Sequence, residues 1–127
     1  MPDRVHQAGC RHLSTPPVHV QESVHNEFAQ KVAEHMEAVR VGDGLDSSTT
    51  MGPCINQSQA DHAQAHVDDA KEKGAQVLCG GSRPANLDKG FFMSPTLLGN
   101  AMRNMRVYQE ETFAPVIPLF KCAPAYL

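Results

Sequence analysis

The sequence of 127 residues lacks a long apolar run, and it has no excess of basic charge. A membrane-spanning helix needs about 20 consecutive apolar residues. Lys and Arg total 11 against 14 Asp and Glu, so the formal net charge is −3. Because a protein that binds nucleic acid or anionic lipid usually carries a basic surface, we predict no nucleic-acid partner and no membrane partner.

The sequence also lacks the dense, paired cysteines of a disulfide scaffold. Its four cysteines are scattered along the chain, at Cys10, Cys54, Cys79 and Cys122. This spacing favours free thiols in a reducing compartment. Neither the apolar core of a secretory signal nor an amphipathic, arginine-rich transit helix is visible near the N-terminus. We therefore expect a cytoplasmic or mitochondrial matrix location.

Two segments have apolar residues at helical spacing. The first runs from Ser23, a plausible N-cap, to about Arg40, and its predicted buried face is Val24, Phe28, Val32, Met36 and Val39. The second begins after Asn56, with Gln59 in the capping-box position, and ends at Gly74. Its apolar stripe is narrow and made of small residues, which predicts close packing against a sheet.

Four short segments have the composition of strands. They are 18–20, a buried strand at 77–79, a strand at 91–98 broken or bulged at Pro95, and a last strand at 115–121. Pro118 lacks an amide proton, so we expect it at a sheet edge or at a position that makes no ladder hydrogen bond. The order of elements predicts an α/β fold with helices packed on a parallel or mixed sheet.

The segment from Val107 to Lys121 carries the clearest chemical pattern. Two adjacent acids, Glu110 and Glu111, precede the aromatic Phe113. A carboxylate can accept hydrogen bonds from sugar hydroxyls, and the ring can form an apolar wall, which together suit a diol-bearing ligand with a flat ring. A polar turn leading into a buried strand is the alternative interpretation.

Five motifs agree in order with one known family. They are Glu110–Pro115, Val20-Gln21 before a helix, Gly52-Pro53, Lys73–Ala75 followed by Gly80-Gly81, and Phe91–Leu98. Together they resemble the motifs of the NAD(P)-dependent aldehyde dehydrogenase superfamily. The amino-acid sequences of 42–45 and 52–55 are most similar to its succinate-semialdehyde dehydrogenase branch. The resemblance covers residues 20–121. It leaves a divergent, irregular segment at 1–19 and a divergent tail at 122–127.

The resemblance implies a cofactor, NAD or NADP, and two residues that contact it. Glu111 matches the glutamate that hydrogen-bonds the nicotinamide ribose, and Phe113 matches the aromatic residue beside the nicotinamide. Ala114 stands where the family has glycine, and Gln59 falls near a position close to the cofactor ribose. The implied substrate is a small aldehyde similar to succinate semialdehyde.

The catalytic residues of that family have no match in this sequence. Its nucleophile is a cysteine in a Gly-Gln-x-Cys motif, which forms a thiohemiacetal with the aldehyde. The corresponding position is His12, and Cys10 has neither the motif nor the spacing. The Glu-Leu-Gly-Gly segment with the general base and the dinucleotide-binding half are also unmatched. We expect a fragment of the catalytic domain that has no catalytic residue and is inactive alone.

Two other functions remain open. As a non-enzymatic module, the chain would dock on full-length homologous subunits, since the family forms homo-oligomers. His62 and His66, four residues apart, could share a helix face in a metal site. A solvated helix face is the simpler interpretation of this pair, so we predict no metal site. The adjacent acids at 110 and 111 would point to opposite faces of an extended segment, which argues against a paired-carboxylate hydrolase.

Overall fold

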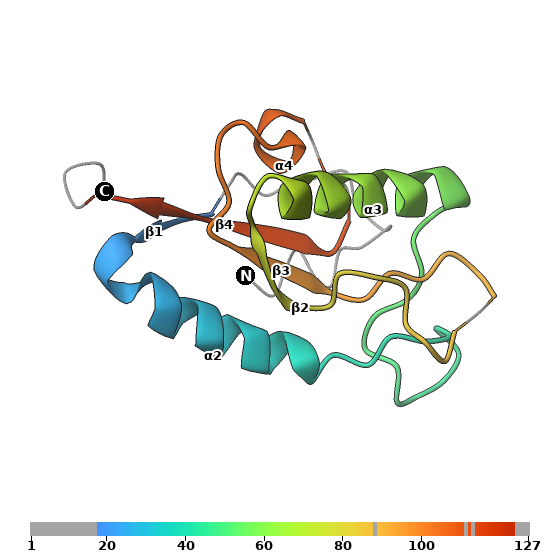
Figure 1. The fold of residues 1–127 in the computed structure, drawn as a ribbon. Helices are drawn as coiled ribbons and strands as arrows, with labels where there is room; N and C mark the ends of the chain where they lie inside the picture. The colour runs from blue at the N-terminus through green and yellow to red at the C-terminus, as the bar shows by residue number, and fades with distance from the viewer. Residues whose placement is uncertain (1–17, 88, 111, 113, 124–127) are drawn as a thin grey trace.

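The computed structural model describes residues 18–87, 89–110, 112 and 114–123. It contains a four-stranded sheet with helices on both faces (Figure 1). The elements in chain order are β1 (Val18–Gln21), the 3₁₀ turn η1 (Glu22–Val24), α2 (His25–Glu37), α3 (Gln57–Glu72), β2 (Gln76–Cys79), β3 (Thr96–Gly99), α4 (Arg106–Gln109) and β4 (Val116–Cys122). In the described part of the chain, no helix is both long and apolar enough to cross a membrane.

The sheet is mixed, which confirms the predicted α/β fold. Its strand order is β1-β4-β3-β2, so β4 lies in the interior, although it is the last strand along the described chain. β4 pairs in parallel with both β1 and β3, whereas β2 pairs with β3 antiparallel. β1 begins at Val18 and β4 ends at Cys122. The sheet therefore extends slightly beyond the segment 20–121 at both ends.

Two hydrophobic cores lie on opposite faces of this sheet, because neighbouring strand residues point to opposite sides. α2 covers one face, on which the buried strand residues are Val20, Leu97, Ile117 and Leu119. α3 and α4 cover the other face, on which the buried strand residues are Leu98, Val116 and Phe120. The small residues of α3 (Ala60, Ala63, Ala70) lie in this second core, as the narrow stripe predicted.

The first helix starts later than predicted. Ser23 lies within η1, and α2 begins at His25 after Val24, which makes no side-chain capping bond. The prediction of Ser23 as an N-cap is therefore wrong. Four residues of the predicted apolar face lie in the core on this side of the sheet, namely Phe28, Val32, Met36 and Val39. Val24 does not, because it belongs to the 3₁₀ turn and is 46% exposed.

The second helix begins and ends as predicted. Asn56 is its N-cap, and the Asn56 side chain accepts a hydrogen bond from the Gln59 amide at 2.8 Å. The Gln59 side chain returns to accept from the amide of Ile55 at 3.0 Å, one residue before the usual capping-box partner. Gly74, with φ of 104°, follows the C-terminal end in the left-handed conformation.

Two of the strand predictions need correction. β2 is not buried, because it lies at the sheet edge and its residues alternate between exposed and half-buried. In the segment 91–98 only Thr96 to Leu98 belongs to a strand, which continues to Gly99. Pro95 has no amide proton with which to hydrogen-bond to a neighbouring strand. The first hydrogen bond toward β4 is donated by the amide of Thr96 to the carbonyl of Pro115, at 2.8 Å.

Pro118 lies in an interior strand, at a position where its missing amide proton is tolerated. The carbonyls of Pro115 and Leu119 accept hydrogen bonds from the β3 side. Because successive residues of a strand bond to opposite sides, residue 118 faces β1. The pairing of β1 with β4 begins at Leu119, one residue later. No described residue of β1 pairs with Pro118, and β4 is not an edge strand.

Gly80 is the glycine on which the β2–β3 corner depends most. Its φ is 72°, and a Cβ atom placed there would run into the carbonyl oxygen of Pro95 and lie 2.9 Å from the Thr96 hydroxyl. Both the conformation and the close approach exclude a side chain. Gly74 has a positive φ in open space, and Gly44 has no atom within 4 Å of such a Cβ.

We predict that Gly80→Ala lowers the free energy of unfolding by about 2 kcal/mol or more, because it combines a positive φ with a backbone clash. Gly74→Ala should lower it by about 1 kcal/mol, since it adds the conformational penalty alone. Gly44→Ala is the matched control and should have little effect. Urea denaturation followed by circular dichroism measures all three, and equal losses at Gly80 and Gly44 would contradict the packing described here.

Candidate functional site

The two residues predicted to contact a cofactor, Glu111 and Phe113, lie outside the described residues. Their described neighbours connect α4 to β4. Glu110 is extended, with φ of −124° and ψ of 154°, and Thr112 and Ala114 are 6% and 5% exposed. Thr112 and Ala114 therefore lie in the protein interior, whereas Glu110 is exposed.

Ala114 fits its position without strain. Among the described residues other than glycine, only Asn100 has a positive φ. Ala114 thus occupies a backbone conformation that any residue can adopt, and its methyl group lies in the core that α3 covers. The replacement of the family glycine is tolerated at this position.

His66 connects α3 to the segment 110–114. Its Nδ1 lies 2.6 Å from the hydroxyl of Thr112, and its side chain is fully buried. Burial lowers the pKa of His66, the nearby His62 and Arg106 lower it further, and Glu110 partly opposes them. The imidazole is therefore held in its neutral form at neutral pH, inside the protein, beside the segment that carries the predicted cofactor residues.

The prediction of a solvated face for both histidines is wrong for His66. His62 is exposed, but His66 has no exposed surface. Their ring centroids lie 4.2 Å apart. The sequence did indicate that His66 is buried, because position 66 shares a helix face with the apolar stripe at Ala63, Val67 and Ala70.

Asp69, one turn beyond His66, caps α4 from a neighbouring helix. Its carboxylate accepts a hydrogen bond from the backbone amide of Arg106 at 2.8 Å. It also forms an ion pair with Lys73 at 3.0 Å, and Lys73 donates to the carbonyl of Asn104 at 2.9 Å. The amide of Arg106 and then the ammonium of Lys73 lower the pKa of Asp69. Sequence periodicity gives no indication of this cap, because the two partners are 37 residues apart.

Glu110 is oriented by Arg106, four residues earlier. The Nε of Arg106 donates to Oε2 of Glu110 at 2.8 Å, and this bond is the main reason that the pKa of Glu110 is lowered. The other carboxylate oxygen, Oε1, lies 3.7 Å from Nε2 of His66. His62, His66 and Glu110 together offer ligand atoms that all lie within 4.8 Å of one another.

Cys54 and Cys79 do not have the environment of a nucleophile. Cys54, Cys79 and Cys122 are free thiols. Burial raises the pKa of Cys54, and burial together with the charge of Glu37 raises the pKa of Cys79. A raised pKa keeps both groups in the unreactive thiol form at neutral pH. Cys10 lies outside the described residues.

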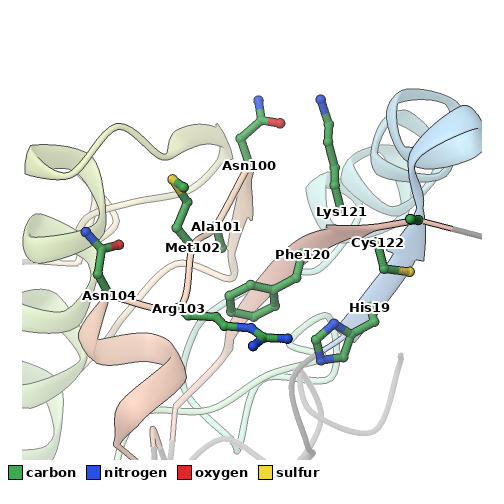
Figure 2. Close-up of a pocket in the computed structure, with 10 residues that line it drawn as sticks. His19, Asn100, Ala101, Met102, Arg103, Asn104, Phe120, Lys121 and Cys122 are labelled. Carbon is green, nitrogen blue, oxygen red and sulfur yellow. The ribbon is translucent and has the colours of Figure 1, made fainter. Parts of the chain in front are cut away.

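A concave region lies at the carboxyl end of the parallel strands. It is a hollow of about 850 Å³ between the end of β4, the residues that follow β3, and β1. Figure 2 shows the Arg103 side chain extending alongside Phe120 toward His19. The rings of His19 and Phe120 have centroids 5.5 Å apart. Carboxyl ends of strands are the usual ligand-binding edge of α/β sheets.

We predict that Asp69→Asn destabilises the chain in a pH-dependent way. The folded state lowers the pKa of Asp69 below its ordinary 3.8, so the ionised carboxylate stabilises the fold above about pH 4. This contribution is lost as the pH falls through the lower, folded-state pKa. Urea midpoints of wild type and variant should therefore differ most at neutral pH and converge in acid.

The control for this prediction is Asp68→Asn, because Asp68 is exposed and hydrogen-bonds with Gln64 on the same helix. Its urea midpoint should remain close to wild type. A difference for Asp69→Asn that is as large at pH 3 as at pH 7 would show that the carboxylate charge has no part in capping α4.

Comparison with known proteins identifies the family of this fold. Residues 3–125 match the aldehyde dehydrogenase family, which extends the match beyond the motifs at 20–121. The chain is 40% identical over 104 residues to the NADP⁺-dependent succinate-semialdehyde dehydrogenase of Escherichia coli, covering 82% of this chain and 21% of that protein. It is 45% identical over 103 residues to the mitochondrial succinate-semialdehyde dehydrogenase of Rattus norvegicus, covering 80% of this chain and 19% of that protein.

A solved structure agrees with these relatives. The aldehyde dehydrogenase of Mycobacterium tuberculosis, crystallised with NAD⁺, superimposes with a TM-score of 0.88 at 30% identity, covering 96% of this chain and 25% of that one. The chain thus spans about a fifth of the length of the curated relatives it matches. The family match across nearly the whole sequence, together with the shared fold, shows that this chain belongs to the aldehyde dehydrogenase family.

Proposed function

We propose that this chain is part of an NAD(P)-dependent aldehyde dehydrogenase that oxidises a small aldehyde similar to succinate semialdehyde. The observation that carries the proposal is the 45% identity to a succinate-semialdehyde dehydrogenase over 103 residues, which is 80% of this chain. In the intact enzyme, a cysteine outside the motifs of this sequence attacks the aldehyde to form a thiohemiacetal. Once hydride had passed from the thiohemiacetal to the nicotinamide cofactor, water would release the carboxylic acid from the cysteine.

Glu111 and Phe113 are proposed to contact the cofactor. When it is bound, NAD⁺ or NADP⁺ supplies the acceptor for hydride from the substrate. The Glu111 carboxylate can accept hydrogen bonds from ribose hydroxyls, and Phe113 can provide an apolar wall for a flat ring. The NADP⁺ in the name of one relative and the NAD⁺ in the structure of another support a nicotinamide cofactor of either kind.

The described residues support this role by holding the segment at fixed points. Thr112 is bound to His66, and Glu110 is oriented by Arg106. These contacts fix the two sequence neighbours of Glu111. A cytoplasmic or mitochondrial matrix location goes with this proposal, since one relative is mitochondrial.

We predict that a polypeptide of these 127 residues will not oxidise succinate semialdehyde. The sequence matches neither the nucleophile motif nor the general-base segment, and burial keeps Cys54 and Cys79 as thiols. The measurement is absorbance at 340 nm with NAD⁺ or NADP⁺ and the purified chain. A full-length relative such as the E. coli enzyme is the positive control, and NADH or NADPH formed above background by the chain alone would contradict the prediction.

Docking on full-length subunits is the second candidate, and the sheet edge favours it. β1 is the terminal strand of the described sheet, so one side of its backbone is unpaired. Met102, in the adjoining hollow, is 58% exposed. An open strand edge next to exposed apolar surface is typical of a site that pairs with another polypeptide.

We expect the tagged chain to retain a full-length succinate-semialdehyde dehydrogenase in a pull-down with purified components. Met102→Lys should weaken retention about fivefold or more, because it places a charge in the apolar part of the hollow. Leu45→Lys is the matched control, since Leu45 is 96% exposed and does not line the hollow. Equal retention of the two variants would exclude the hollow as the docking surface.

A further inference from the structure

Three side chains from two parts of the chain converge beside α3. His62 and His66 lie on consecutive turns of that helix, and Glu110 follows α4. One ligand atom from each lies within 4.8 Å of the other two. Imidazole nitrogen and carboxylate oxygen are the ordinary protein ligands of zinc and related divalent ions.

His66 is the fixed point of this group. The ring is fully buried, and its Nδ1 is held by the Thr112 hydroxyl at 2.6 Å. Its Nε2 is buried and has no hydrogen-bond partner among the described residues. A buried polar atom without a partner is unfavourable, so this nitrogen requires an explanation that packing alone does not give.

The contact with Thr112 prepares His66 for a ligand role. A threonine hydroxyl can accept a hydrogen bond, and with the proton on Nδ1 the lone pair of the ring lies on Nε2. Histidines that bind metals usually donate the other ring N–H to an oxygen in this way, which fixes the ring orientation. Nε2 lies 3.7 Å from Oε1 of Glu110, so its lone pair is placed beside the carboxylate.

Glu110 presents one oxygen to this nitrogen while the other oxygen is held. Arg106 Nε bonds to Oε2 at 2.8 Å, and the remaining contact of the guanidinium to Oε1 is long, at 3.4 Å. Arg106 therefore orients the carboxylate without blocking Oε1. The positive charge of Arg106 would disfavour binding of a cation, but the ion pair with the negatively charged Glu110 neutralises it.

We propose that His62, His66 Nε2 and Glu110 Oε1 bind a divalent transition-metal ion of the zinc class. Tetrahedral zinc, with bonds of about 2.1 Å, holds its ligand atoms roughly 3.4 Å apart. The present separations of up to 4.8 Å close by rotation of the two exposed side chains, while His66 keeps its place. Two nitrogen ligands select this class over calcium and magnesium, which prefer all-oxygen sites.

The bound ion would join α3 directly to the residues that precede β4. Glu110 and Thr112 would then both be tied to His66, one through the metal and one through the hydroxyl. These two residues flank Glu111 in the sequence. The metal site nevertheless stands on His62, His66 and Glu110 alone and does not depend on a cofactor role for that segment.

The test is isothermal titration of the 127-residue chain with ZnCl₂ in a buffer that does not chelate zinc. We expect one saturable site, which weakens at least about tenfold in His62→Gln and in Glu110→Gln. Both side chains are exposed, so neither substitution opens a cavity. His35→Gln is the matched control, because His35 is an exposed helix histidine outside the cluster, and its affinity should stay within about twofold of wild type.

A second control separates the ligand role of Glu110 from its ion pair. Arg106→Gln removes the same ion pair but leaves the carboxylate, so zinc affinity should be retained or increased. In a long-range ¹H–¹⁵N spectrum, zinc should shift the His66 side-chain nitrogens but not those of His35. Unchanged affinity in His62→Gln and Glu110→Gln, or an equal loss in Arg106→Gln, would overturn the proposal.

Discussion

The structure depends on β4, a strand that is buried on both faces. Val116, Ile117 and Leu119 are at most 1% exposed, and Phe120 is 4% exposed. Val116 and Phe120 contribute to the core under α3, whereas Ile117 and Leu119 contribute to the core under α2. Because burial of apolar surface is the main stabilising term in folding, β4 joins two cores that would otherwise be separate.

Polar contacts add a second level of organisation on the α3 side. Asp69 caps the start of α4, and His66 binds Thr112, so two adjacent turns of α3 contact α4 and a residue between α4 and β4. Each partner is far away in the sequence but close to the same buried helix face. This arrangement explains how a short irregular segment is kept in place beside a core.

Much of the fold was predictable, because its elements follow local rules. The N-cap at Asn56, the C-terminal glycine at 74 and the last strand follow from side-chain chemistry within a few residues. The start of α2 was predicted wrongly, since a 3₁₀ turn absorbed Ser23. The edge position of β2 was also missed, because strand order is set by pairing between distant segments.

The candidate site was less predictable for the same physical reason. The spacing of His62 and His66, and the place of His66 on the apolar stripe of α3, were visible in the sequence, but the hydrogen bond between His66 and Thr112 joins residues that are 46 positions apart. The cap that Asp69 provides for α4 is likewise formed between distant residues. Glu111 and Phe113 were identified by resemblance alone, and they lie outside the described residues, so their role rests on the family motif.

The position of β4 in the sheet has a consequence for folding during synthesis. Val18 in β1 pairs with Leu119 in β4, about a hundred residues later. The ribosome releases the chain from its N-terminal end, so β1, α2 and α3 emerge before β4, the strand against which all three pack. β3 covers part of these apolar faces when it emerges, but the two cores are completed only when 116–122 appears, and contacts across so long a loop form slowly. A nascent chain therefore keeps part of its apolar surface exposed until β4 has been released.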